Sequence, residues 1–187
     1  MKRHPNEPTV TRRTIIASAT FVPLAALKAP VAAQTAAAPA RALSASERKI
    51  LDAFVDRLIP ADELGPGALQ GGAAEYIDRC LADYLAAEKD SIVAGLRSLP
   101  AGFADLTPEK RDEVLTSIQN QPFFARVRRL TLEGMFGDPH YGGNVNFVGW
   151  DLIKYPGPRP AVAPEDQKMG VEIKPYHRSA WGNEHGH

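Results

Sequence analysis

Apolar side chains recur at helical spacing through the middle of the chain, and this periodicity constrains the fold more than any other feature. After Ser44, the residues Ile50, Leu51, Phe54, Val55 and Leu58 follow the spacing of one helix face. Ser44 and Glu47 have the spacing of a capping box, and Pro60 ends the pattern. We therefore predict a first helix that begins after Ser44 and ends before Pro60.

Four further segments repeat this pattern and are separated by turn-forming residues. Their apolar residues are Ile77, Leu81, Tyr84 and Leu85; Ile92, Val93 and Leu96; Val114, Leu115 and Ile118; and Phe123, Phe124, Val127, Leu130 and Thr131. Thr107-Pro108 forms a cap and first-turn pair, and another helix begins near Pro122. No strand pattern of comparable quality precedes residue 145. The sequence therefore predicts a mainly α protein, a small bundle of four to five helices with a long irregular C-terminal extension rich in Pro and Gly.

The first 33 residues have the features of an export signal. Basic residues precede an uncharged run from Thr14 to Leu27, and small residues follow at positions 31–33. The run has 14 residues, whereas a membrane-spanning helix needs about 20. Arg12 and Arg13 directly precede this run, as in a twin-arginine signal, and an ordinary secretory signal is the alternative. We predict a cleaved twin-arginine signal peptide over residues 1–33 and a periplasmic location.

The mature chain is expected to have three parts: a flexible linker over 34–43, a helical domain over 44–133, and a partner-binding loop with an extended tail over 134–187. Removal of residues 1–33 leaves 17 basic and 21 acidic side chains. Because no basic excess is present to neutralise phosphates, a dedicated nucleic-acid binder is not expected. A mildly acidic chain is also not attracted to anionic lipids, so any membrane contact is expected only through a partner.

Cysteine usage excludes several kinds of site. Cys80 is the single cysteine, which rules out an internal disulfide framework, a thiolate zinc cage and a C-x-x-C-H haem attachment. Its position beside the apolar stripe favours a small buried hydrophobe over a reactive or intermolecular thiol. No cofactor-binding motif is found in the chain. Since twin-arginine export carries folded proteins, a bound partner would explain the use of that route.

The composition of the sequence changes at Gly134. Residues 134–144 are dense in turn-forming residues with interleaved aromatic side chains. Beyond them, the residues Phe147, Trp150, Leu152, Ile153 and Tyr155 supply a large apolar area. A free tail would leave Ile173, Tyr176 and Trp181 in water, so we expect residues 156–187 either to wrap back over the helices or to lie on another protein.

These C-terminal motifs resemble a known family. The sequence GMFGDPHYGGN at 134–144, Gly149-Trp150, and Tyr155-Pro156-Gly157 resemble the signature of the gluconate 2-dehydrogenase subunit 3 family. The resemblance extends to the twin-arginine leader, to the Ile-Pro-x-Asp turn at 59–62 and to Gly-Pro-Gly-Ala at 65–68. The family pattern tends to have Gly before Tyr-Pro-Gly, where this chain has Lys154.

The resemblance implies a complex of three unlike chains. A large subunit binds FAD and oxidises a sugar acid, sugar or polyol, and a multihaem cytochrome c with haem c passes electrons to membrane quinone. The small chain itself carries no cofactor, metal or catalytic residue. It is implied to assist maturation of the flavin subunit and its export through the twin-arginine translocase, with the assembled complex associated with the inner membrane.

Partner contacts are then the sites expected in this chain. The candidates are Phe136, Asp138, His140, Tyr141, Asn144, Trp150 and Tyr155, with Arg126 and Arg129 as rim charges. Trp150 and Tyr141 rank first, because interface energy concentrates in a few Trp, Tyr and Arg side chains. The alternative is that Phe136, Phe147 and Trp150 only close the end of the bundle, Asp138 only caps a turn, and the arginines only line a solvated helix edge.

Two other hypotheses are open at this stage. The chain could be a stand-alone periplasmic enzyme that uses Asp138 and His140 as an acid/base pair, although no serine or cysteine nucleophile accompanies them in sequence. A metal could bind His177 with Glu184, His185 and His187, although a frayed terminus is a poor scaffold for a closed ligand set.

Overall fold

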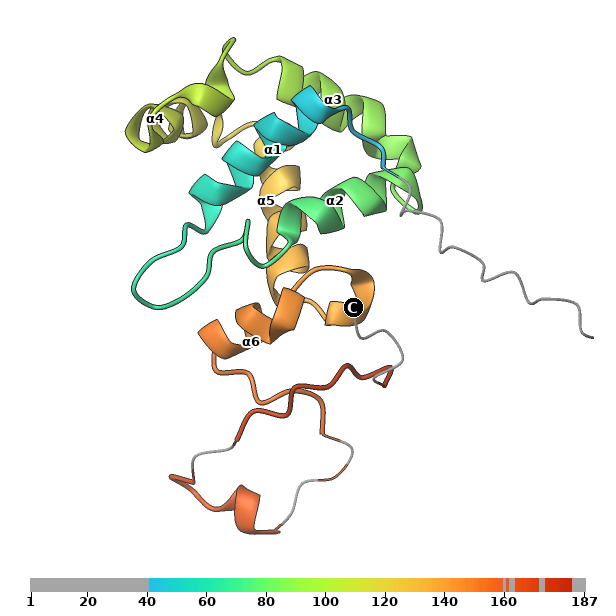
Figure 1. Cartoon of the computed structure of the whole chain (residues 1–187), viewed down its shortest axis with the longest axis vertical. Coiled ribbons are helices and arrows are strands. Elements are labelled where there is room, and N and C mark those ends of the chain that lie inside the picture. Colours follow the sequence, from blue (N-terminus) through green and yellow to red (C-terminus); the bar gives the residue numbers. More distant parts are fainter. Residues whose placement is uncertain (1–40, 160, 162–163, 172–173, 183–187) are drawn as a thin grey trace, which may run out of the picture. The chain divides into compact units, whose positions relative to one another are not determined.

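The protein is a small helical bundle with an irregular C-terminal part (Figure 1). The computed structural model describes residues 41–159, 161, 164–171 and 174–182. Its α-helices are α1 (Ala45–Leu58), α2 (Ala73–Ala82), α3 (Lys89–Arg97), α4 (Pro108–Ile118), α5 (Pro122–Phe136) and α6 (Val148–Leu152). The described residues contain no β-strand, and this confirms the predicted mainly α class. The predicted leader with Arg12 and Arg13, most of the linker, and Ile173 lie outside the described residues.

Local signals set the helix ends. The capping box is present, since the Ser44 backbone N–H donates to Glu47 Oε2 at 2.8 Å and Ser44 Oγ accepts from the Glu47 N–H. Hydrogen bonds from Ser44 and ion pairing with Arg97 outweigh the effect of burial and lower the pKa of Glu47. Thr107 caps α4 and Pro122 opens α5, as predicted. Short 3-10 turns join the remaining elements: η2 (Ala86–Glu88), η3 (Phe103–Asp105), η4 (Pro139–Tyr141), η5 (Val145–Phe147) and η6 (Pro164–Gln167).

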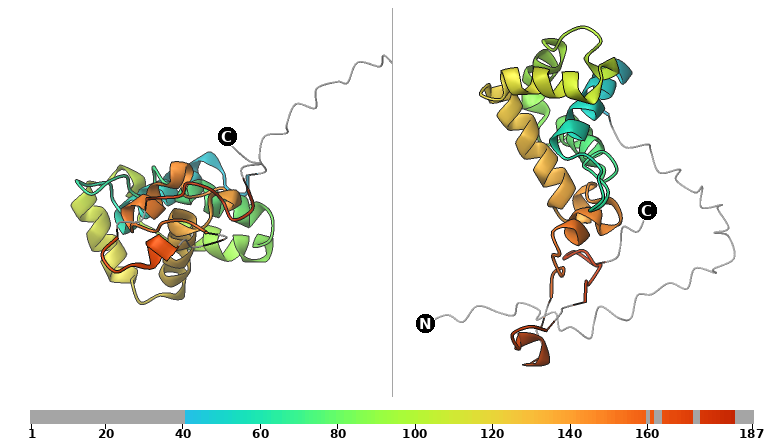
Figure 2. Two further views of the ribbon diagram at one scale, coloured as in Figure 1. Left: turned by 90° about the horizontal axis from the view of Figure 1, so that it is seen from below. Right: turned by 90° about the vertical axis from the view of Figure 1, so that its left-hand side faces the viewer.

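Helices α1 and α5 organise the hydrophobic core. Helix α1 contacts α2, α3, α4 and α5, while α5 also contacts α2, α3 and α6. The fully buried ring of Phe54 on α1 lies 5.8 Å from Phe123 and 5.7 Å from Phe124 at the start of α5. Figure 2 shows that α5 extends from the α4 end of the bundle to α6. It therefore connects the core to the irregular C-terminal part.

Three features differ from the predictions. Tyr84 was expected on the apolar stripe of the second helix, but it is exposed because α2 ends at Ala82 and the Leu85 N–H donates to Cys80 O in a wider turn. Helix α5 continues past residue 133 to Phe136, and the short helix α6 lies within the segment expected to be irregular. Among the described residues, no helix is long and apolar enough to cross a membrane.

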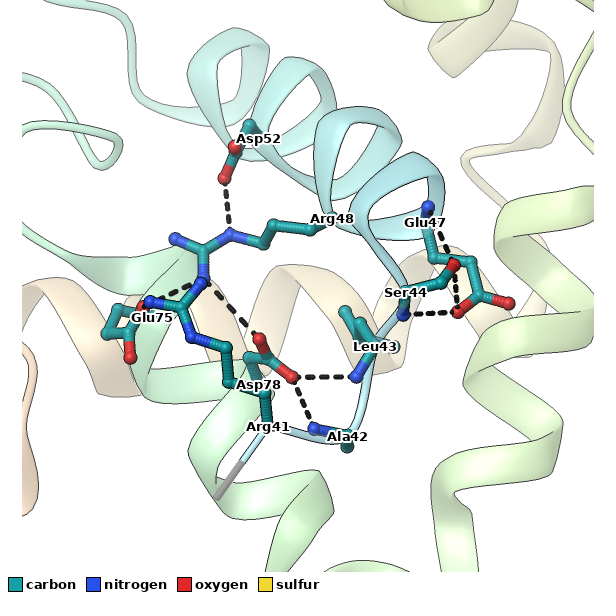
Figure 3. A network of polar contacts seen from close by, with 9 residues as sticks. All are labelled: Arg41, Ala42, Leu43, Ser44, Glu47, Arg48, Asp52, Glu75 and Asp78. Atoms are coloured by element: carbon teal, nitrogen blue, oxygen red, sulfur yellow. Dashed lines mark hydrogen bonds and ion pairs between the residues drawn. The ribbon is translucent and has the colours of Figure 1, made fainter. Parts of the chain in front are cut away.

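A buried carboxylate holds the residues that directly precede α1 (Figure 3). Asp78 on α2 is fully buried, and its Oδ1 accepts the backbone N–H groups of Ala42 at 2.8 Å and Leu43 at 2.9 Å. Its Oδ2 lies 3.5 Å from Arg48 Nη1, which also bonds Glu75 at 2.8 Å. Ala42 and Leu43, which directly precede the N-cap of α1, are therefore anchored to α2.

Candidate functional site

The loop after α5 is built on close backbone contacts. Asp138 caps η4, since its Oδ1 accepts the backbone N–H of His140 at 2.9 Å. At Gly143, a Cβ atom would overlap the backbone of Gly134, so only glycine allows the loop to lie this close to α5. The signature spacing of glycines thus sets how tightly the loop packs on the helix.

Asn144 holds this loop together from the inside. It is fully buried and has a left-handed backbone with φ of 46°. Its Nδ2 donates to Gly137 O at 2.9 Å, its Oδ1 accepts from Gly149 N at 2.8 Å, and its own N–H donates to Gly134 O at 2.7 Å. Asn144 therefore connects the end of α5, the loop and the start of α6.

Trp150 joins α6 to the end of α5. Its indole Nε1 donates to the carbonyl of Phe136 at 2.9 Å, and the side chain is almost completely buried. Its ring lies 5.3 Å from Phe147 and 5.0 Å from Tyr155, the latter in an edge-to-face arrangement. The buried Trp150 thus holds the exposed ring of Tyr155 in place, because edge-to-face aromatic pairs are favourable.

The C-terminal tail returns to this loop and is tied to it. The second oxygen of Asp138 accepts the backbone N–H of Ala180 at 2.8 Å. Burial opposes ionisation of this carboxyl, but hydrogen bonds from the Ser179 side chain and from the N–H groups of His140 and Ala180 lower the pKa of Asp138. Its carboxylate is therefore an ionised acceptor that joins two segments 42 residues apart.

Ring contacts reinforce the return of the tail. His177 stacks on Phe147 with ring centroids 4.9 Å apart, and its Nε2 lies 2.7 Å from Asp151 Oδ1. Trp181 stacks on His140 at 5.5 Å. The Tyr176 N–H donates to Pro156 O at 2.8 Å. Of the two alternatives for the tail, its residues 174–182 wrap back over the protein.

In the described part of the loop and tail, four Tyr and Trp rings stay exposed. They are Tyr141, Tyr155, Tyr176 and Trp181, which we call the aromatic surface. Tyr141 is 53% exposed and Trp181 is 64% exposed, although each is held by a ring contact or a backbone hydrogen bond of its segment. Rigid aromatic rings lose little conformational entropy on binding, so this surface is suited to contact another protein.

A groove of about 840 Å³ lies beside the aromatic surface. It is formed between α2 and η4 and is lined by Tyr76, Arg79, Cys80, Ala82, Asp83, Tyr84, His140 and Tyr141. Cys80 is almost completely buried, as predicted from its place beside the apolar stripe. The groove brings His140 and Tyr141 of the signature loop together with α2, which the sequence did not indicate.

The structure distributes the predicted site residues over different environments. Tyr141 and Tyr155 are exposed, Phe136 and His140 are partly buried, and Asn144 and Trp150 are buried within this chain. Arg126 makes two hydrogen bonds to Glu88 at 2.6 and 2.7 Å, and Arg129 bonds Glu133 at 2.9 Å. Partner contacts by these residues stay a prediction; within the chain, Asn144 and Trp150 shape the loop that presents the others.

Several contributors were not expected from the sequence. Arg79, His177 and the backbone of Ala180 were not named as parts of this site, and their roles depend on contacts between distant segments. A sequence signal for the wall of the groove formed by α2 and the turn after it was present. Tyr76, Cys80 and Tyr84 follow one another at four-residue spacing, which places neighbouring side chains on one side of a helix. No comparable local signal exists for the tail.

The two alternative hypotheses gain no support from the geometry. Both oxygens of Asp138 accept backbone hydrogen bonds, and its lowered pKa suits an ionised structural acceptor rather than a general acid. Among the described residues, no group of three or more His, Cys, Asp or Glu is placed to hold a metal ion. Glu184, His185 and His187 lie outside the described residues, and His177 pairs with Asp151.

Comparison with known proteins identifies the family. The family model for gluconate 2-dehydrogenase subunit 3 matches residues 45–157, from the start of α1 to the glycine after the Tyr-Pro turn. No curated protein and no solved structure matches the chain significantly. The match covers most of the described fold, including the loop built by Asp138 and Asn144. The chain therefore belongs to the gluconate 2-dehydrogenase subunit 3 family.

Proposed function

We propose that this protein is the non-catalytic small subunit of a periplasmic dehydrogenase complex and that it binds the FAD-containing large subunit through the aromatic surface. The complex would oxidise a sugar acid or sugar, with gluconate as the substrate named by the family. Family membership supports a role as a subunit of an oxidoreductase. The large subunit would carry out the chemistry, and this chain would bind it.

The observation that carries the proposal is a surface of aromatic rings that is both exposed and held in place. Tyr155 packs on the buried Trp150, and Trp181 stacks on His140. Exposed rings on a fixed scaffold are costly for a chain that stays alone in water, because their apolar area is not buried. The same rings bury that area in a complex at low entropic cost.

The export role follows from linkage. A chain that binds only the folded flavin subunit stabilises it by mass action. If the leader with Arg12 and Arg13 is a twin-arginine signal, the translocase would carry both folded subunits together, because one of them bears the signal. A multihaem cytochrome c would then complete the complex and attach it to the inner membrane.

Paired expression tests the proposal. The mature chain and the flavin subunit of the same organism are produced separately and together, and flavin absorbance and gluconate-dependent dye reduction are measured. We expect the small chain alone to show neither flavin nor activity, and the pair to copurify with flavin bound. Activity of the purified small chain, or no copurification, would contradict the proposal.

A further inference from the structure

The groove between α2 and η4 has features that its own chain does not use. It is lined by the nearly buried Cys80 and by the exposed rings of Tyr84 and Tyr141. The hydroxyl groups of Tyr76 and Tyr84 lie 3.0 Å apart, and Tyr76 also donates to Glu133 at 3.3 Å. The polar groups of its wall are therefore paired, and what it offers to solvent is mainly aromatic and apolar surface.

Arg79 differs from these paired groups and, like Asp83, forms no ion pair among the described residues. Its guanidinium lies directly against Gly142, where a Cβ atom would overlap it. No carboxylate of the described residues forms an ion pair with Arg79, in contrast to Arg126 and Arg129 on α5. Asp83 also lines the groove, at the exposed C-cap of α2, and is not paired with Arg79. The end of the groove next to η4 therefore presents a positive charge.

The groove is continuous with the aromatic surface. His140 and Tyr141 line the groove, and Tyr141 is also part of the aromatic surface. His140 in turn carries the stacked ring of Trp181. A partner that binds Tyr141 and Trp181 would therefore lie next to the groove.

We propose that this groove receives a peptide segment of the flavin subunit that places an apolar side chain over Cys80 and a carboxylate on Arg79. The inference rests on the proposed function, because it names the part of the partner that the small subunit recognises. The volume of about 840 Å³ accommodates several side chains. A guanidinium takes a carboxylate through two parallel hydrogen bonds, which gives this contact directional specificity.

Charge reversal at Arg79 is the main test. The affinity of the mature chain for the purified flavin subunit is measured for Arg79→Glu and for the control Arg128→Glu, which reverses an exposed arginine on α5. We expect Arg79→Glu to weaken binding at least tenfold and the control to stay within twofold of the wild type. Equal effects of the two substitutions would overturn the inference. If the wild-type chain does not bind the flavin subunit at all, the proposed function itself is refuted.

Alkylation of a cysteine placed in the groove provides a second readout. Cys80 is almost completely buried, so Tyr84→Cys, at an exposed position that lines the groove, reports through its alkylation by iodoacetamide whether the groove is covered. We expect alkylation to slow at least tenfold in the complex and to be independent of protein concentration in the free chain. An unchanged rate in the complex would overturn the inference. Slowing in the free chain with rising concentration would indicate a second copy as the occupant and would overturn it as well.

Folding of the variant is checked separately. Arg79→Glu should melt within a few degrees of the wild type, because Arg79 makes no ion pair among the described residues. If it does not fold, Tyr84→Ser replaces it, since Tyr84 is exposed, lines the groove and is not part of the aromatic surface. In that case a tenfold weaker complex supports the inference, and unchanged affinity overturns it.

Discussion

The carboxylate of Asp138 accepts a hydrogen bond from the backbone N–H of Ala180 at 2.8 Å, and so joins the signature loop to the C-terminal tail. The same carboxylate caps η4 through the N–H of His140. One side chain thus fixes the turn that carries Tyr141 and the tail that carries Trp181. The exposed rings of Tyr141 and Trp181 are therefore positioned by this acid.

Removal of this acceptor should release the tail. In Asp138→Asn, an amide NH₂ replaces one oxygen and faces a backbone N–H. We therefore expect the free energy of local unfolding of the loop and tail to fall by about 1–3 kcal/mol. Hydrogen exchange should accelerate at residues 174–182 and stay unchanged in α1 and α3. Asp90→Asn, an exposed aspartate on α3, is the matched control. Unchanged exchange at 174–182 would show that the Asp138 contact does not hold the tail.

Acid should act through the same carboxylate. The pKa of Asp138 is lowered in the folded protein. Its contribution to stability is therefore fully present above the ordinary carboxyl pKa of about 3.9 and is lost as the pH falls through the lower folded value. The amide NMR signal of Ala180 should titrate with a midpoint below that ordinary value, and the titration should be absent in Asp138→Asn. A midpoint at or above the ordinary value would contradict this prediction.

Asn144 should be more important for stability than its neighbour Asn146. Asn144→Ala leaves the Gly149 N–H and the Gly137 carbonyl without their partners, so we expect a loss of about 2–4 kcal/mol in the free energy of unfolding. Asn146 is exposed and also left-handed, with φ of 55°. Asn146→Ala therefore controls for backbone strain and should cost about 1 kcal/mol. Equal losses in denaturant titrations would refute the hydrogen-bonding role of Asn144.

Replacement of Lys154 should stabilise the protein. Lys154 has a left-handed backbone with φ of 53°, a conformation that glycine adopts without strain. This gives a physical reason for a glycine before Tyr-Pro-Gly. We expect Lys154→Gly to raise the free energy of unfolding by about 0.5–1 kcal/mol, the relief of strain exceeding the entropic cost of glycine. Lys154→Ala, which keeps the strain, should leave stability unchanged; a lower stability of the glycine variant would contradict the interpretation.

Asp78 should hold the residues that directly precede α1. Asp78→Ala removes the acceptor of two backbone N–H groups and leaves Arg48 without its buried partner. We therefore expect the free energy of unfolding to fall by about 3–5 kcal/mol. Limited proteolysis should then reach the segment around Leu43. Glu75→Gln, which changes a less buried partner of Arg48, is the control and should cost less than 1 kcal/mol. Protection of Leu43 in Asp78→Ala would contradict the anchoring role.

The bundle could be predicted from sequence because its signals are local. Ser44 with Glu47, Thr107 with Pro108, and Pro122 each mark a helix start within one turn. The end of α2 was not predicted. The turn after Ala82 is closed by a hydrogen bond from the Leu85 N–H to the Cys80 carbonyl, five residues earlier, and no sequence signal marks it. The candidate site was found only in part. Its loop residues were named, but the contacts of Asp138 with Ala180 and of Arg79 with Gly142 join distant segments, and no periodicity encodes them.

Hydrogen exchange of the mature small chain, alone and bound to the flavin subunit, is the most direct measurement. Binding through the aromatic surface should slow exchange at residues 137–159 and 174–182 and leave α4 unchanged. Protection confined to α3 and α4, or no protection at any saturating concentration of the flavin subunit, would show that this surface does not bind it.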